Sequence, residues 1–186
     1  YGRWKALHYF AKRFYQSIIV DVYANQSKVK FMIINDSLES VDVILDWKIL
    51  DFNGKLLMYG KTNQRLNKIE VLKLKPIKIK KLSQIIDIKK EGIIFYKLMY
   101  QKTKESIDRG FKLFDKPKNF KLKQSNFRIQ VEKDSEKEYL KYDLMISILS
   151  KNISLFTFIE SDLFDFIASE NYFLIEPGES KKIGLR

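Results

Sequence analysis

The sequence predicts an all-β fold of two immunoglobulin-like β-sandwiches preceded by one N-terminal α-helix. After the first fifteen residues, apolar and polar residues alternate along most of the chain, which is the period of half-buried strands. Turn-forming residues interrupt the alternation at short intervals, as in sandwiches. The chain has 186 residues, which is enough for two such domains because an immunoglobulin-like sandwich needs about 100 residues.

The first fifteen residues have a helical period instead. Trp4, Leu7, Ala11 and Phe14 recur at the spacing of one helix face. His8 lies on the same stripe, but no second histidine or cysteine exists to complete a metal site. The chain starts without an initiator methionine or a signal-peptide pattern. We therefore expect it to be cut from a longer protein, with the stripe contacting a missing upstream domain or a second copy of the chain.

The first sandwich is predicted most clearly by residues 41–49, where apolar residues alternate with Asp42 and Asp46. Trp47 falls in the apolar set, so we expect it in the core. Asn53-Gly54 predicts a tight hairpin because both residues tolerate positive φ. The strands expected here are 18–23, 28–35, 41–49, 55–60, 66–74, 77–82, 93–100 and 106–114.

A short polar segment with a proline, residues 115–119, is the expected linker. The predicted domains are thus 1–15, 16–115 and 116–186. The last is smaller and is expected to depend on the first sandwich for stability. Residues 163–167 fit a strand and a helical turn equally well. The strands expected in the second sandwich are 120–131, 139–149, 153–160, 171–175 and 180–185.

The helix and two later passages resemble the β-mannosidases of glycoside hydrolase family 2. Residues 1–15 are similar to the last helix of that family's (β/α)₈ catalytic barrel, which leads into C-terminal immunoglobulin-like domains. Residues 45–55 are similar to the first sandwich after the barrel, and residues 169–179 to a passage near the family's C-terminus. The resemblance implies a non-catalytic, structural region of an enzyme that hydrolyses terminal β-mannosyl residues. Its implied partners are the parent's catalytic barrel and other accessory domains.

Catalytic residues are not expected on this chain. Retaining glycosidases use two carboxylates about 5 Å apart, and the resemblance implies that both lie on barrel strands before Tyr1. Asp42 and Asp46 fit the solvent face of a strand, and residues 132–138 fit a charged loop. Nucleotide-binding and serine-hydrolase motifs are missing from the sequence. We therefore predict no catalytic, cofactor-binding or metal-binding residue, no cofactor, and no activity for this fragment alone.

Two alternative functions remain. One is a carbohydrate-binding module, for which Tyr59, Phe166 and Tyr172 are the candidate sugar-contacting residues because aromatic rings stack on sugars. The other is a nucleic-acid-binding protein, suggested by a net charge of +12. The second is disfavoured because only six of the 35 basic residues are arginine, the residue that best binds phosphate in a forked geometry. Lysines concentrated in residues 73–81 also fit the protection of exposed strand edges.

Composition limits the remaining classes. The chain has no cysteine, which excludes disulfides and thiolate metal sites and favours a reducing, cytoplasmic location. Its longest apolar runs are shorter than the roughly 18 residues of a membrane-spanning helix, so no membrane partner is expected. A homodimer formed through the N-terminal helix stays open as an alternative to contact with the parent's barrel.

Overall fold

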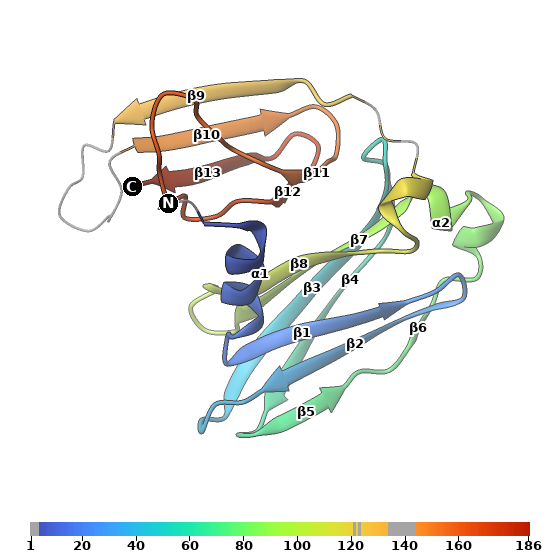
Figure 1. The fold of residues 1–186 in the computed structure, drawn as a ribbon. Coiled ribbons are helices and arrows are strands. Elements are labelled where there is room, and N and C mark those ends of the chain that lie inside the picture. Colours follow the sequence, from blue (N-terminus) through green and yellow to red (C-terminus); the bar gives the residue numbers. More distant parts are fainter. Residues whose placement is uncertain (1–3, 121, 123, 134–143) are drawn as a thin grey trace. The chain divides into compact units, whose positions relative to one another are not determined.

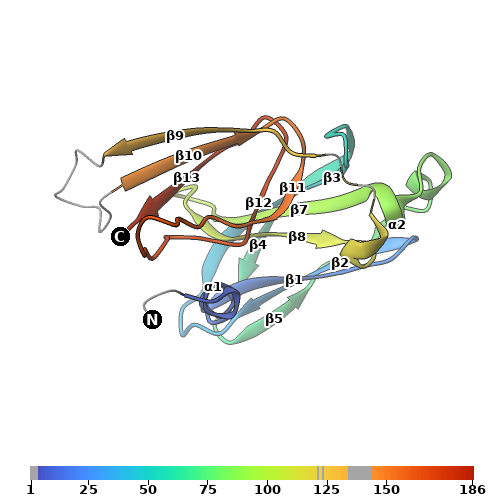
Figure 2. The same ribbon diagram turned by 45° about the horizontal axis from the view of Figure 1, so that its top comes forward.

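The computed structural model describes residues 4–120, 122, 124–133 and 144–186. The chain forms two compact units. Phe14–Lys121 form one, the sandwich unit, and Tyr1–Arg13 together with Leu122–Arg186 form the other, the helix unit. Both contain antiparallel sheets, and an N-terminal helix precedes them (Figures 1 and 2). The predicted all-β fold is confirmed, while the first thirteen residues group with the C-terminal part of the chain.

The sandwich unit contains two antiparallel sheets. Its strands are β1 (Ile18–Ala24), β2 (Lys28–Asn35), β3 (Val41–Asp51), β4 (Leu56–Leu66), β5 (Glu70–Lys73), β6 (Ile77–Lys78), β7 (Gly92–Tyr100) and β8 (Ser106–Leu113). One sheet has the order β1-β2-β5, with β6 also paired to β2, and the other has the order β4-β3-β7-β8. The short helices of this unit are η1 (Leu82–Gln84), α2 (Ile88–Glu91) and η2 (Pro117–Asn119).

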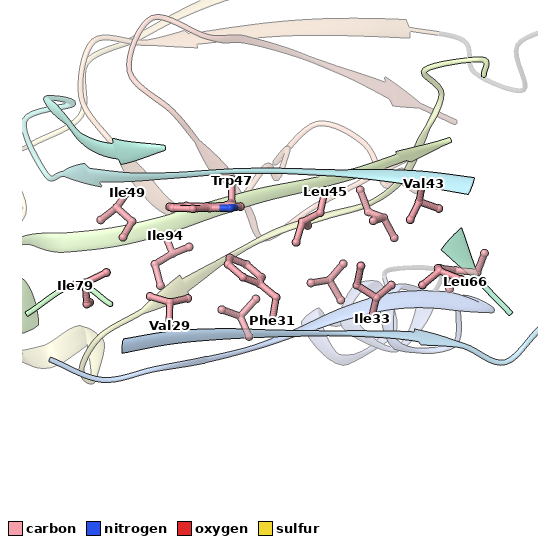
Figure 3. Packing of buried hydrophobic residues seen from close by; sticks show 14 of the residues in the cluster. Val29, Phe31, Ile33, Val43, Leu45, Trp47, Ile49, Leu66, Ile79 and Ile94 are labelled. Carbon is pink, nitrogen blue, oxygen red and sulfur yellow. The ribbon is translucent and has the colours of Figure 1, made fainter. Parts of the chain in front are cut away.

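The core of this unit lies between β2 and β3, whose alternate residues point toward each other (Figure 3). Trp47 is buried there, as its alternation predicted, with its ring 6.0 Å from that of Phe31. Gly60 faces Trp47 from β4, and a Cβ at this position would overlap the indole. The core residues contributed by β2 and β3 are Val29, Phe31, Ile33, Val43, Leu45, Trp47 and Ile49.

Two hydrogen bonds join the sheets at one edge of the sandwich. Asp108 on β8 accepts a hydrogen bond from the backbone N–H of Val20 at 2.8 Å. The hydroxyl of Tyr96 on β7 donates to the carbonyl oxygen of Val20 at 3.2 Å. Both the N–H and the carbonyl of Val20 on edge strand β1 therefore have partners within the unit. This limits the pairing of β1 with a strand of another chain.

A buried asparagine at the end of β2 organises the turns at the other end of the sandwich. Asn35 is fully buried, and its amide nitrogen donates to the carbonyls of Glu39 and Asn67 at 2.9 and 2.7 Å. Its side-chain oxygen accepts hydrogen bonds from the N–H and hydroxyl of Ser37. Such complete satisfaction is what makes a buried amide tolerable.

The segment between β4 and β6 differs from the prediction. The expected strand at residues 66–74 is divided between the end of β4, a turn and β5, with Ile69 in that turn at φ 49°. The expected strand at residues 77–82 shortens to β6 and the turn leading to η1. Alternation persists through both segments, so periodicity could not reveal where the chain turns.

The helix unit is smaller and less regular. It comprises α1 (Ala6–Phe14, with Phe14 just beyond the unit's boundary), β9 (Phe127–Lys133), β10 (Leu144–Ser150), β11 (Ser154–Thr157), β12 (Phe173–Ile175) and β13 (Ser180–Leu185). One sheet has the order β13-β10-β9, and β11 pairs with β12 in a second. Residues 163–167 form neither a strand nor a helix. The charged loop expected at 132–138 lies mostly outside the described residues.

Helix α1 completes the core of this unit. Tyr9 is buried with Ala168 and Phe173 in one apolar cluster, and its hydroxyl accepts a hydrogen bond from the backbone N–H of Ala168 at 3.3 Å. Within the described residues, the helices are too short or too polar to cross a membrane.

Candidate functional site

An aromatic cavity of about 440 Å³ lies within the helix unit. One wall comes from the residues at and before the start of α1, and the others come from the segments around residues 158–166 and 171–172. Its volume falls within the roughly 300–1,000 Å³ of small-molecule sites. The residues that line it are Trp4, Lys5, Ala6, Tyr9, Phe158, Ile159, Glu160, Ser161, Phe164, Phe166, Asn171 and Tyr172.

The rings of the cavity form a connected set. Tyr172 stacks on Phe158 with the centroids 4.8 Å apart and the planes 22° apart. Tyr9 lies 6.1 Å from Tyr172 and 5.4 Å from Trp4, in tilted arrangements. These separations are typical of attractive aromatic pairs. Each ring therefore limits the movement of the next.

Asn171 joins two of the segments that line the cavity. Its side-chain oxygen accepts the N–H of Ile159 and its amide nitrogen donates to the carbonyl of the same residue, both at 2.9 Å. The side chain is buried, so this paired contact acts like a short piece of sheet between the two segments. Tyr172, the next residue, has a φ of 54°. A left-handed conformation is unfavourable for a bulky residue and is often found at binding sites.

A second anchor ties α1 to the strands. The Glu170 carboxylate accepts hydrogen bonds from Arg13 at 2.8 Å and from Lys181 at 2.9 Å. All three side chains are partly buried, which strengthens charge-assisted bonds relative to exposed ones. The bonds of Tyr9 and of Glu170 hold the helix at its middle and near its C-terminal end.

Among the residues that line the cavity, Tyr9 has a pKa shifted from its ordinary value. Burial of its ring raises the pKa of the Tyr9 hydroxyl above its ordinary value. The N–H of Ala168 acts in the opposite direction and is the smaller effect. The hydroxyl is therefore neutral at physiological pH.

The sugar-contacting residues predicted from sequence fall into two groups. Phe166 and Tyr172 both line the cavity. Tyr59 lies in the other unit, on β4, where its side chain is 74% exposed. It is therefore an isolated surface ring.

The four residues predicted to contact a barrel or a second copy of the chain do not share one environment. Leu7 and Phe14 are 74% and 68% exposed on the side of α1 opposite Tyr9. Ala11 is half-buried, and Trp4 precedes the first residue of the helix and lines the cavity.

Sequence reasoning missed Tyr9, Phe158 and Phe164 as cavity residues. Tyr9 lies on the side of the helix opposite the stripe that the periodicity marked, so the sequence pattern did not single it out. Phe158 and Phe164 lie outside the named strands and helices of the structure, so no periodicity marks them. Aromatic residues clustered between 156 and 173 were the one available signal.

Several carboxylates in the described part of the chain form hydrogen bonds or ion pairs that stabilise the fold. Asp42 pairs with Arg65 at 3.1 Å on the surface of the sandwich unit, and Asp108 is bonded to β1. In the linker, hydrogen bonds from the Lys116 N–H and the Asn119 amide lower the pKa of Asp115. No group of three or more His, Cys, Asp or Glu side chains in residues 4–120, 124–133 and 144–186 is placed to hold a metal ion.

The lysines of residues 73–81 are exposed along one sheet of the sandwich unit. Lys78 on β6 lies opposite Lys28 on β2, and Lys73 on β5 lies opposite Met32. The short strands β5 and β6 both pair with β2 at the margin of this sheet. Their position agrees with the protection of a sheet edge.

The fold defines the class of the protein. Phe14–Lys121 form an immunoglobulin-like β-sandwich, and a smaller β module carries the aromatic cavity. The family described as Mannosidase Ig/CBM-like domain matches residues 27–119, which is half of the chain. The chain belongs to this family, and the resemblance found in the sequence is confirmed. No curated protein sequence matches the chain.

Solved structures are similar over nearly the whole chain. A β-D-mannosidase from Dictyoglomus thermophilum superposes with a TM-score of 0.75 at 19% identity, covering 96% of this chain and 20% of that one. An exo-chitosanase from Amycolatopsis orientalis superposes with a TM-score of 0.58 at 11% identity, covering 96% and 24%. At these identities the likeness concerns the fold. The chain spans about a fifth to a quarter of the length of these enzymes.

Proposed function

We propose that the chain is a non-catalytic accessory region of a family-2 glycoside hydrolase, a β-mannosidase that removes terminal β-mannosyl residues. The observation that carries this proposal is the match of residues 27–119 to Mannosidase Ig/CBM-like domains. The β-D-mannosidase of similar fold supports it, since its chain is about five times as long and leaves room for a separate catalytic domain.

The partner of this region is the catalytic barrel of the same parent. Leu7 and Phe14 leave an apolar stripe exposed on α1, while the opposite face is buried in the helix unit. Each such side chain contributes about 1.5–3 kcal/mol when removed from water. In the intact enzyme this stripe would pack against the barrel, so α1 would connect the two. Self-association through the same stripe is the alternative.

Hydrolysis of aryl glycosides tests the proposal. The parent protein should release nitrophenol from aryl β-mannoside, and residues 1–186 alone should not. The matched control is the aryl β-glucosaminide, because an exo-chitosanase shares the fold. A parent that cleaves the glucosaminide but not the mannoside would contradict the proposed substrate. Activity of residues 1–186 that one Asp or Glu substitution abolishes would contradict the accessory role.

Sedimentation of the isolated chain tests the partner. Residues 1–186 with both Leu7→Ser and Phe14→Ser should remain folded, and the same changes in the parent should lower its stability. If the isolated chain is a dimer that these changes convert to a monomer, and the parent is unaffected, the stripe serves self-association instead.

A further inference from the structure

We propose that the aromatic cavity of the helix unit is a binding site for one or two pyranose rings of a neutral sugar. The inference rests on the proposed function only in that the parent acts on carbohydrate. It adds a second sugar site on a unit outside residues 27–119, the part that matches the domain family.

The exposed rings provide the surface for a sugar. Phe158 and Phe164 are 47% and 48% exposed, and Trp4 is 38% exposed, although all three line the same cavity. A pyranose has an apolar face of C–H groups and an edge of hydroxyls, so it can cover a ring while its hydroxyls remain hydrated or bonded. The rings are thus surfaces that a flat, amphipathic ligand fits.

Polar groups at the cavity match the hydroxyl edge of that ligand. The side chains of Lys5 and Glu160 form no hydrogen bond or ion pair with other described residues. The Ser161 hydroxyl accepts the N–H of Leu163 at 3.1 Å, which leaves its proton available to donate. Vicinal sugar hydroxyls both donate and accept, so they can bond to an ammonium, a carboxylate and a hydroxyl together.

The same groups argue against other ligands. A purely apolar molecule would desolvate the Glu160 carboxylate without replacing its hydrogen bonds. A phosphate-bearing ligand would meet that negative charge with only Lys5 to oppose it. A neutral polyhydroxyl compound avoids both costs.

The site is also held in place before any ligand arrives. Asn171 clamps the segment of Ile159, and Tyr172 stacks on Phe158. The left-handed backbone of Tyr172 directs an aromatic ring where a glycine would cost less. Ordering the lining in advance reduces the entropy that a ligand must overcome.

Fluorescence titration of residues 1–186 tests this site, because the chain has two tryptophans and only Trp4 lines the cavity. The probes are the β-linked disaccharides of mannose, glucose and N-acetylglucosamine. At least one should change the fluorescence saturably, with a Kd on the order of 1 mM. Phe158→Ala should raise that Kd about three- to tenfold, as expected for loss of one stacking ring. Tyr59→Ala removes an exposed ring outside the cavity and should leave the Kd unchanged.

A second variant shows whether Trp4 only reports sugar binding by its fluorescence or is itself required for binding. Trp4→Phe keeps a ring in the cavity but should abolish the fluorescence change while calorimetry still detects the sugar. Thermal unfolding of each variant checks that the helix unit stays folded. The proposed site would be wrong if none of the three sugars bound. It would also be wrong if Tyr59→Ala raised the Kd as much as Phe158→Ala does. The outcome is independent of the parent's substrate, because binding here with no β-mannosidase activity in the parent would contradict only the proposed function.

Discussion

The two units of the chain close their cores in different ways. In the sandwich unit, every buried residue of the main apolar cluster comes from the contiguous stretch between Ile18 and Leu98. In the helix unit, the cluster joins Tyr9 to residues between 146 and 185. A core that needs a segment more than a hundred residues away must bring together the two ends of the chain before it forms.

The difference is also one of size. The sandwich unit packs two four-stranded sheets against each other, whereas the helix unit has one three-stranded sheet and one pair of short strands. Small modules bury too little apolar surface to be stable by a wide margin. We infer that α1 supplies what the strands of the helix unit lack, and that this unit opens first under stress.

The largest expected effect is that of removing residues 1–13. The loss of Tyr9 and Arg13 would open the core of the helix unit, so hydrogen-exchange protection should disappear from β10 and β13 and persist in β3. The matched control, Leu7→Ser, changes the exposed face of α1 and should preserve both. Full protection of β13 after the deletion would mean that the strands form their own core.

Within the sandwich unit, Asn35→Ala should lower the free energy of unfolding by about 2–4 kcal/mol. The change leaves the carbonyls of Glu39 and Asn67 without their buried donor, and such losses are large. Asn63→Ala, at an exposed position of β4, should change stability by less than about 0.5 kcal/mol. Urea unfolding followed by the fluorescence of Trp47 measures both, and equal effects would show that the buried amide is dispensable.

A smaller effect is expected for Arg13→Met. The substitution keeps an apolar stem but removes the bond to Glu170, which should cost the helix unit about 1 kcal/mol. Lys12→Met, on an exposed position of the same helix, is the control. Urea unfolding monitored by exchange at β13 should separate the two variants at low salt, and the gap should narrow at high salt. Equal stabilities of the two variants at low salt would show that the Arg13–Glu170 ion pair does not stabilise the helix unit.

The smallest expected effect is a pH dependence of the helix unit. Burial raises the pKa of Tyr9, so the folded state holds this proton more tightly than the unfolded state. The resulting stability is complete below the unfolded pKa of about 10 and is lost as pH rises above it. Between pH 8 and about 11, melting of the helix unit should therefore shift downward more in the natural chain than in Tyr9→Phe. Identical shifts would show that other groups control the alkaline transition.

The strands were the most predictable part of the fold. The expected bounds 28–35 and 180–185 coincide with β2 and β13. Buried and more exposed side chains alternate along β2, whereas residues 183–185 of β13 are all buried. The core position of Trp47 followed from the same alternation. Where alternation continued through a turn, as between β4 and β5, the prediction joined two strands into one.

By itself the sequence determined the fold class and the family resemblance, and it named Phe166 and Tyr172 as aromatic candidates without placing them together. These conclusions need only local periodicity and the order of residues along the chain. The partner of α1 and the cavity as a whole were decided by tertiary structure. Tyr9 and Ala168 are 159 residues apart, and a contact at that separation depends on which surfaces meet once the strands have formed, which no local pattern specifies.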